Sequence, residues 1–278
     1  MSESQLVNNI TKNRPLHCLH TIPYLDRSAG GPVLALLSYV RSLVHAGVEI
    51  SVGGLTERGG DPIDLPGCVQ VVSDDRRFGG AFRYCPELRS SLTGIFPDLI
   101  HSHGLWTYAS YLSGYLSEKK NIPHILAPCG MLQEGALERS RWKKRVARVV
   151  FQDRVLKEAE CLHAKSEAEL QGMRSYGLEN PVAVVPNPVV PPRSRKETDQ
   201  REFRRQHGLP EEKKILLFLG RLHPIKGLER LLQAWSRVSN GDDNWHLVLA
   251  GPDEGGYRAE VDGLARELRC RNDVTFPG

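Results

Sequence analysis

The sequence predicts an α/β fold in which a parallel sheet is covered by helices on both faces. Two observations carry this prediction. Short apolar runs alternate along the chain with segments whose apolar residues recur at helical spacing, and strand–helix–strand repeats of this kind build parallel sheets. The composition, 40% hydrophobic and 25% charged over 278 residues, is that of a globular protein with one large domain or two smaller ones.

Apolar runs of strand length mark the first part of the chain. They span residues 16–20, 48–53, 69–72, 99–102, 124–127, 161–163 and 182–185. Between the first two, residues 32–46 carry apolar side chains at helical spacing, with Pro32 in the first turn and Gly47 just past the end. These segments predict an N-terminal Rossmann-like domain over residues 1–190.

A second unit of the same kind follows a segment that cannot continue a sheet. Residues 186–196 are rich in proline and charge, so we predict a linker over residues 191–212. Strands at 214–219, 245–250 and 273–276 then alternate with helices at 226–239 and about 256–270. They predict the first half of a second Rossmann-like domain over residues 213–278.

The composition indicates the cellular compartment and excludes some classes of binding partner. The six cysteines include no Cys-x-x-Cys pair, which indicates a reduced, cytoplasmic protein with neither a zinc site nor a disulfide framework. The N-terminus has no apolar core, and no stretch is long enough to span a membrane, so we expect neither a signal peptide nor an anchor. A net charge of +4 is too small to predict nucleic-acid binding.

Ligands of open α/β sheets collect at the carboxyl ends of the strands, so the strand-to-helix loops hold the first candidates. Gly30 and Gly31 follow the first strand and precede its helix. Adjacent glycines let backbone approach a ligand, and the helix N-terminus behind them favours a phosphate. A simple flexible turn explains the pair equally well.

Two histidines end the strand at 99–102. His101 and His103 lie two residues apart, so their side chains share one face of the strand and a metal pair has to be considered. No third ligand appears at a suitable spacing, and we therefore predict no metal.

Three further residues stand in turns that follow later strands. Gly130 lies in the turn that follows the strand at 124–127, and Ser166 begins a Ser-x-x-Glu capping box with Glu169, which explains both polar residues structurally. Asn187 follows Val-Pro after the strand at 182–185. Simple turns and caps remain the alternatives to ligand contact at each of these positions.

The strand at 214–219 leads into Gly220 and Arg221, with Lys226 close behind at the start of a predicted helix. Two cations on one strand-end loop can hold a diphosphate: the planar guanidinium binds two phosphate oxygens, and the lysine adds a point charge. A solvated pair of surface charges is the alternative.

Taken together, these motifs resemble those of retaining, nucleotide-sugar-dependent glycosyltransferases of the GT-B fold, in the family 4 type. The resemblance implies that Gly30, Gly31 and Gly130 lie near the donor or acceptor and that His103 points toward the transferred sugar. His101 would pack or bond beneath it. Ser166 and Asn187 match family motifs and are our further candidates for donor or acceptor binding, and Gly220 belongs to the motif of the cationic pair.

For function, the resemblance implies transfer of a sugar from a nucleotide-diphosphate donor to a hydroxyl, with retention and without a cofactor. Arg221 and Lys226 would stabilise the leaving diphosphate, which itself helps to deprotonate the acceptor. Cell-surface polysaccharide or lipid-linked glycan synthesis is the expected setting, with a glycan or lipid-linked acceptor.

The family pattern also contains a part that is not found here. Family 4 enzymes complete the second domain with a Glu-x7-Glu segment for the donor sugar and ribose, whereas this sequence ends at Gly278. We therefore also consider a catalytically incompetent α/β module that binds an acceptor or a protein partner. A dinucleotide oxidoreductase is disfavoured, because no Gly-x-Gly-x-x-Gly follows a strand.

Residues 139–151 form a strongly basic segment with no acidic residue between Glu138 and Asp153. On a helix, Trp142, Val146 and the two valines at 149–150 share one side. The segment could rest on an anionic membrane, at the inner face of the plasma membrane. Equally, its apolar side could pack on the core while the cations face water.

Overall fold

The computed structural model describes residues 14–57, 59–74, 82–189, 197–239, 244–253 and 255–278. The chain divides into two compact units, Met1–Val190 and Pro191–Gly278, and each is described by itself. Within the described residues, no helix combines the length and the apolar content needed to cross a bilayer.

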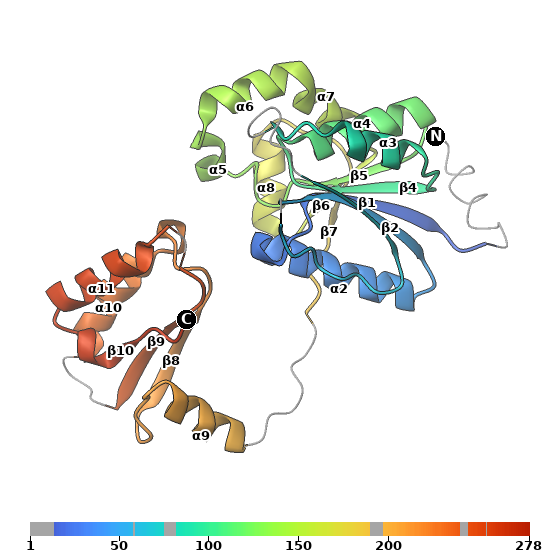
Figure 1. The fold of residues 1–278 in the computed structure, drawn as a ribbon. Helices are drawn as coiled ribbons and strands as arrows, with labels where there is room; N and C mark the ends of the chain where they lie inside the picture. The colour runs from blue at the N-terminus through green and yellow to red at the C-terminus, as the bar shows by residue number, and fades with distance from the viewer. Residues whose placement is uncertain (1–13, 58, 75–81, 190–196, 240–243, 254) are drawn as a thin grey trace. The chain divides into compact units, whose positions relative to one another are not determined.

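The N-terminal unit is built on a parallel sheet of seven strands (Figure 1). In spatial order, these are β3 (Val69–Asp74), β2 (Glu49–Thr56), β1 (His17–Tyr24), β4 (Leu99–His103), β5 (His124–Ala127), β6 (Cys161–Ala164) and β7 (Val182–Val184). From β1 the chain adds strands outward in one direction (β2, then β3), and from β4 it adds them in the other direction (β5, β6, then β7). The direction of strand addition therefore reverses between the neighbouring strands β1 and β4. Such a switch point is where open α/β sheets form binding crevices.

Helices cover both faces of this sheet, as the apolar periodicity predicts (Figure 1). Helix α2 (Gly31–His45) buries Val33, Leu36 and Val40 against one face. On the other face, α3 (Pro86–Thr93) and α4 (Tyr108–Lys120) bury leucines together with Tyr108. The fold is therefore the predicted α/β arrangement.

The last part of the N-terminal unit is mostly helical. It contains α5 (Glu134–Glu138), α6 (Arg141–Ala147), the π-helical turn η3 (Arg148–Gln152), α7 (Asp153–Glu158) and α8 (Glu167–Ser175). A short 3-10 turn, η1 (Arg27–Ala29), lies between β1 and α2.

The C-terminal unit has a parallel sheet of three strands in the order β10 (Val274–Thr275), β9 (Trp245–Ala250) and β8 (Lys214–Leu219). Its helices are α9 (Glu197–Gln206), α10 (Leu228–Ser239) and α11 (Tyr257–Glu267), with 3-10 turns η4 (Pro224–Lys226) and η5 (Arg271–Asp273).

Two details of this unit differ from the prediction. Helix α9 lies in the range predicted as a linker; its sequence is polar almost throughout, so apolar periodicity gave no sign of it. Helix α10 starts at Leu228 rather than at Lys226, because Gly227 adopts a left-handed conformation (φ 69°) that ends the preceding 3-10 turn. Lys226 is therefore the last residue of that turn.

Candidate functional site

Four histidines form one cluster at the carboxyl ends of the N-terminal sheet. His20 comes from β1, His101 and His103 from β4, and His163 from β6. His20 Nδ1 lies 3.0 Å from His103 Nε2, and His101 Nε2 lies 3.1 Å from His163 Nδ1, so the four imidazoles form two hydrogen-bonded pairs. Only the two on β4 stand out in the sequence, because their partners are distant in the chain.

A small residue lets the cluster cross β5. Ala127 is the register partner of His103 on β5, and β6 follows as the next strand. Because its side chain is a single methyl group, the imidazoles of β4 can reach His163 beyond it. His163 Nε2 in turn lies 2.8 Å from the carbonyl oxygen of Val185, just after β7.

Helix α2 closes over the cluster with a tyrosine. The hydroxyl of Tyr39 lies 3.3 Å from His163 Nε2 and 3.1 Å from the carbonyl oxygen of Pro186. Its ring meets that of His163 edge-on. The predicted residue Asn187 follows directly and lies exposed in the coil after β7.

Burial keeps these imidazoles neutral. Desolvation, with a contribution from the charge of His163, lowers the pKa of His20 from 6.5 to about 4. It also lowers the pKa of His101 and His103 well below 6.5, where the neighbouring histidines add to the effect. Neutral imidazoles donate from one nitrogen and accept at the other, so the two pairs are matched in donors and acceptors.

The cluster is also where a metal ion would be sought. One nitrogen from each of His20, His101 and His103 lies within 4.8 Å of the others, a grouping that the sequence analysis did not foresee. Both nitrogens of the His20–His103 contact already satisfy each other, and the three residues supply no anionic ligand. His20 Nε2 is buried without a partner among the described atoms.

The glycine loop before α2 is open on its outer side. Gly30 has φ 71° and ψ −134°, a backbone conformation that L side chains rarely adopt. A Cβ atom at Gly30 or Gly31 would meet nothing within 4 Å. A ligand group can therefore approach this backbone at the N-terminus of a 15-residue helix.

The turns after β5 and β6 lie side by side. Cys129 has φ 55° and Gly130 has φ 76°, and a Cβ on Gly130 would lie 3.6 Å from a carboxylate oxygen of Glu169. Ser166 caps α8: its hydroxyl accepts from the Glu169 N–H at 3.3 Å, while Glu169 accepts from Lys165 N–H at 3.0 Å. Glu169 thus reaches the residue before the cap, a variation on the predicted capping box.

Lys165 belongs to the same group of residues, although it is not among the candidates predicted from the sequence. Its positive charge acts to lower the pKa of both the Cys129 thiol and His103. Burial raises the pKa of the Cys129 thiol despite this lysine. The Cys129 Sγ donates to the carbonyl oxygen of Ala127 at 3.3 Å.

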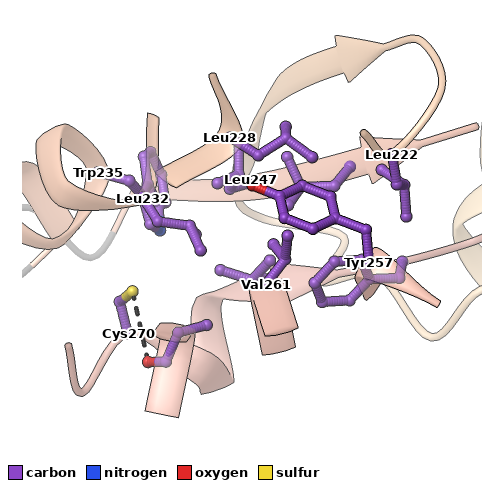
Figure 2. Close-up of a cluster of buried hydrophobic side chains, with 12 residues drawn as sticks. Leu222, Leu228, Leu232, Trp235, Leu247, Tyr257, Val261 and Cys270 are labelled. Carbon is purple, nitrogen blue, oxygen red and sulfur yellow. Dashed lines mark hydrogen bonds between the residues drawn. The ribbon is translucent and has the colours of Figure 1, made fainter. Parts of the chain in front are cut away.

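The cationic loop of the C-terminal unit is fixed at both ends by buried leucines. Leu222 and Leu228 are buried in the core between the sheet and its helices, as Figure 2 shows together with Tyr257. Arg221 and Lys226 stand beside these anchors and are exposed. The loop therefore presents two cations to solvent from a backbone that is held at fixed points.

Backbone hydrogen bonds join this loop to the one that follows β9. Gly220 N–H donates to the carbonyl oxygen of Ala250, and Leu222 N–H donates to that of Pro252, both at 2.9 Å. Gly251 fits between them with φ 142°; a Cβ there would lie 2.0 Å from the carbonyl oxygen of Gly220. Glycine is thus required at position 251. In the sequence, the only sign of this requirement is the Gly-Pro pair that follows the predicted strand.

A 3-10 turn places the lysine. His223 Nδ1 accepts from Ile225 N–H at 3.1 Å, and the carbonyl oxygen of His223 accepts from Lys226 N–H at 2.9 Å. Gly227 then ends the turn, and α10 begins. An arginine and a lysine on one such loop supply the charged donors to which phosphate oxygens form strong hydrogen bonds.

Comparison with known proteins identifies the family. Residues 30–188 match the family described as "Glycosyl transferase 4-like domain", and residues 199–278 match "Glycosyl transferases group 1". The chain belongs to this glycosyltransferase family. The GT-B resemblance drawn from the sequence is thereby confirmed.

Among curated relatives, D-inositol 3-phosphate glycosyltransferase 2 of Catenulispora acidiphila is 28% identical over 97% of this chain and 69% of the relative. D-inositol 3-phosphate glycosyltransferase of Actinosynnema mirum is 29% identical over 64% of this chain and 45% of the relative. The chain therefore spans between about half and two thirds of the length of these two glycosyltransferases.

Solved structures confirm the GT-B fold. Anabaena Alr3699/HepE in complex with UDP and glucose superposes with a TM-score of 0.70 at 17% identity, over 95% of this chain and 69% of that one. Sucrose-phosphate synthase of Thermosynechococcus elongatus gives a TM-score of 0.67 at 18% identity, over 95% and 70%.

Proposed function

We propose that this glycosyltransferase chain moves a sugar, with retention, from a nucleotide-diphosphate sugar to a hydroxyl acceptor. The observation that carries the proposal is the exposed pair Arg221 and Lys226, which stand beside the buried anchors Leu222 and Leu228. Their charges would bind the diphosphate and stabilise it as it leaves. Alr3699/HepE, which shares the fold, has been solved with UDP-glucose, and this supports a nucleotide-sugar donor.

On the N-terminal unit we assign the acceptor side to His103 and the loops around it. Gly30, Gly31, Gly130 and Ser166 stand at strand ends or helix starts, as the predicted binding roles require. Neutral His103 would bind a sugar hydroxyl through the nitrogen that His20 does not use. We propose that the reaction needs no metal or other cofactor.

We place the protein in the cytoplasm, in polysaccharide or lipid-linked glycan synthesis. All six cysteines are free, as in reduced proteins. We also propose peripheral membrane contact through residues 139–151, because the structure exposes the apolar side of that segment: Trp142 is 69% and Val149 85% exposed. The alternative prediction of a core-facing apolar stripe is wrong for these residues.

Calorimetric titration with UDP-, GDP- and ADP-sugars tests the donor site. We expect Arg221→Ala and Lys226→Ala each to weaken binding about 10- to 100-fold, because each removes a charge-assisted contact worth about 1.5–3 kcal/mol. Arg230→Ala, which removes an exposed cation from α10, is the matched control and should leave the affinity unchanged.

The outcomes separate the two functions under consideration. Equal affinity of all variants for the preferred donor would contradict the diphosphate role of the loop. Absence of binding to every donor would favour the non-catalytic module as the function of this chain. Once a donor that binds is known, acceptors can be tested for sugar transfer, and they should include D-inositol 3-phosphate, after which two relatives are named. The anomeric configuration of the product then tests whether the reaction proceeds with retention.

A further inference from the structure

One continuous helical stretch in the N-terminal unit has two halves of opposite character. Residues 141–158 comprise α6, the π turn η3 and α7 (Figure 1). In the first half, an apolar stripe is exposed, consisting of Trp142 (69%), Val146 (56%), Val149 (85%) and Val150 (72%). In the second half, Val155 and Leu156 are buried in the core. Of the first half, Ala147 packs against this core, whereas the four larger apolar residues of the stripe do not.

The π turn separates the two halves and anchors the helix. Gln152, at its end, is fully buried; its Oε1 accepts from the backbone N–H of Trp106 at 2.7 Å and from the Ser110 hydroxyl at 3.3 Å. Phe151 packs in the same core. A π turn contains more residues than an α turn and so shifts the helical phase. The exposed stripe is consequently held by a rigid anchor rather than by its own packing.

A groove runs along one flank of the exposed stripe. It has a volume of about 940 Å3 between α5, α6, η3 and α8, and four cations line it: Arg141, Lys144, Arg145 and Arg148. Two carboxylates, Glu134 and Glu138, offset part of this charge. We call this the cationic groove.

Two of the four cations have partners within the protein. The Lys144 ammonium donates to the carbonyl oxygen of Ala136, and Arg148 pairs with Asp153 at 3.4 Å and stacks over Tyr176. Within the part of the chain that the structure describes, Arg141 and Arg145 form no salt bridge. These two guanidiniums therefore remain available to an external anion.

Helical geometry puts the groove and the stripe on adjoining sides. At about 100° per residue of α6, positions 141, 144 and 145 fall within a sector next to the one that contains positions 142 and 146. Lys143 lies on the opposite flank of the stripe. An apolar stripe with cations on both flanks has the pattern of a helix that lies in the interface of an anionic membrane.

We propose that the cationic groove binds the phosphate headgroups of anionic membrane lipids while the apolar stripe enters the acyl boundary. This inference rests on the membrane contact proposed above and names the lipid chemistry that it requires. Trp142 suits the interface, since its ring is apolar and its indole N–H is polar. Each cation near an anionic surface strengthens partitioning about fivefold at low salt.

The groove also connects the membrane surface to the acceptor side. Leu132 and Gln133 line it, and they also line the small pocket that contains Gly130 and Glu169. A headgroup bound there lies beside the turn that follows β5. A lipid-linked acceptor would thus be presented at the surface to which the enzyme binds.

Vesicle co-sedimentation of the full 278-residue chain tests this inference. Vesicles of phosphatidylcholine alone are compared with vesicles that contain about one third phosphatidylglycerol. We expect at least tenfold stronger binding to the anionic vesicles, with a steep loss between low and high salt. Arg141→Ala/Arg145→Ala should remove most of the anionic preference but retain the weak binding to neutral vesicles. Trp142→Ser/Val149→Ser should lose binding to both.

Matched controls distinguish lipid binding from general surface effects. Arg41→Ala/Lys157→Ala removes two exposed cations elsewhere on the unit, and Phe96→Ser removes an aromatic ring that is 74% exposed. Both should bind as the parent chain does. Competition by glycerol phosphate at millimolar concentration would show that free phosphate, rather than a lipid surface, is the ligand.

The proposal would be overturned by equal binding of parent and Arg141→Ala/Arg145→Ala to anionic vesicles, or by no binding of the parent chain. It would also be overturned if light scattering without vesicles showed a dimer that Trp142→Ser/Val149→Ser dissociates, since a second copy would then cover the stripe. If the parent chain and Arg141→Ala/Arg145→Ala bind only the neutral vesicles, the proposed membrane contact is retained but the proposed phosphate-headgroup site is wrong. Donor titration is independent of all these results.

Discussion

The two candidate loop regions are held in place in different ways. Around His103, the N-terminal unit uses buried side chains: imidazoles from three strands bond one another beneath Tyr39. Around Arg221, the C-terminal unit uses backbone bonds, and Gly251 lets two loops touch. The histidine cluster should therefore be sensitive to pH and to side-chain chemistry, whereas the cationic loop should be sensitive mainly to backbone geometry.

The largest expected effect is at Gly251. Gly251→Ala would place a methyl group against the carbonyl oxygen of Gly220 at a φ of 142°. We expect the free energy of unfolding of the C-terminal unit to fall by about 2–4 kcal/mol. Hydrogen exchange measured by mass spectrometry reports each unit separately and should show faster exchange from β8 and β9 but not from the N-terminal strands.

Gly263→Ala provides the control for that change. Gly263 lies within α11, and a Cβ there would meet nothing within 4 Å. Alanine is the better helix former, so this variant should be stabilised by about 0.5–1 kcal/mol. If Gly251→Ala behaved in the same way, the role given to backbone contact between the two loops would be wrong.

Acidification should affect the N-terminal unit through its histidines. The pKa of His20 is lowered from 6.5 to about 4, so between these pH values the unfolded chain binds more protons than the folded one. Stability must then fall as the pH is lowered through this window. For one such imidazole, the loss from pH 7 to pH 5 is about 2 kcal/mol.

Urea unfolding at pH 7 and pH 5 measures this dependence. His20→Leu removes the titrating group, and the pH-dependent loss in the variant should be smaller by about 2 kcal/mol, although His101 and His103 still contribute. His45→Leu, at an exposed position in the last turn of α2, is the matched control for the loss of one histidine. The same pH dependence in His20→Leu and the parent chain would contradict a neutral buried cluster.

The smallest effect concerns the side-chain bond within the cationic loop. His223→Ala removes the acceptor for the Ile225 N–H, at the surface. We expect a cost of only about 0.5–1 kcal/mol, because the exposed N–H can bond water instead. His223→Asn retains an acceptor and should recover most of it. A loss as large as that at Gly251 would mean that side chains hold this loop too.

Much of the fold could be predicted because strand and helix periods are local properties of the sequence. The apolar runs located the strands of both sheets, and the Ser-x-x-Glu pattern located the cap of α8. Helix α9 was not predicted, since a polar helix has no apolar period. The start of α10 was misplaced, because a left-handed Gly227 is not distinguishable from a helical glycine in sequence.

The candidate site was predicted less completely because its partners are distant along the chain. His20 and His103 are 83 residues apart, and nothing local pairs them. Periodicity grouped Trp142, Val146 and the valines at 149–150 on one side of a helix, but it does not say what covers that side. The structure answers that question for the N-terminal unit: the stripe is exposed.

The π turn at Arg148–Gln152 has a consequence for the evolution of this surface. A chain shortened there by one residue could keep an unbroken helix, yet the part before the turn would rotate by about 100° relative to the buried Gln152. Trp142 and its neighbours would then face a different direction, with no change in their identity. A single codon deletion would thus redirect the stripe for which we propose membrane contact, without changing any of its residues.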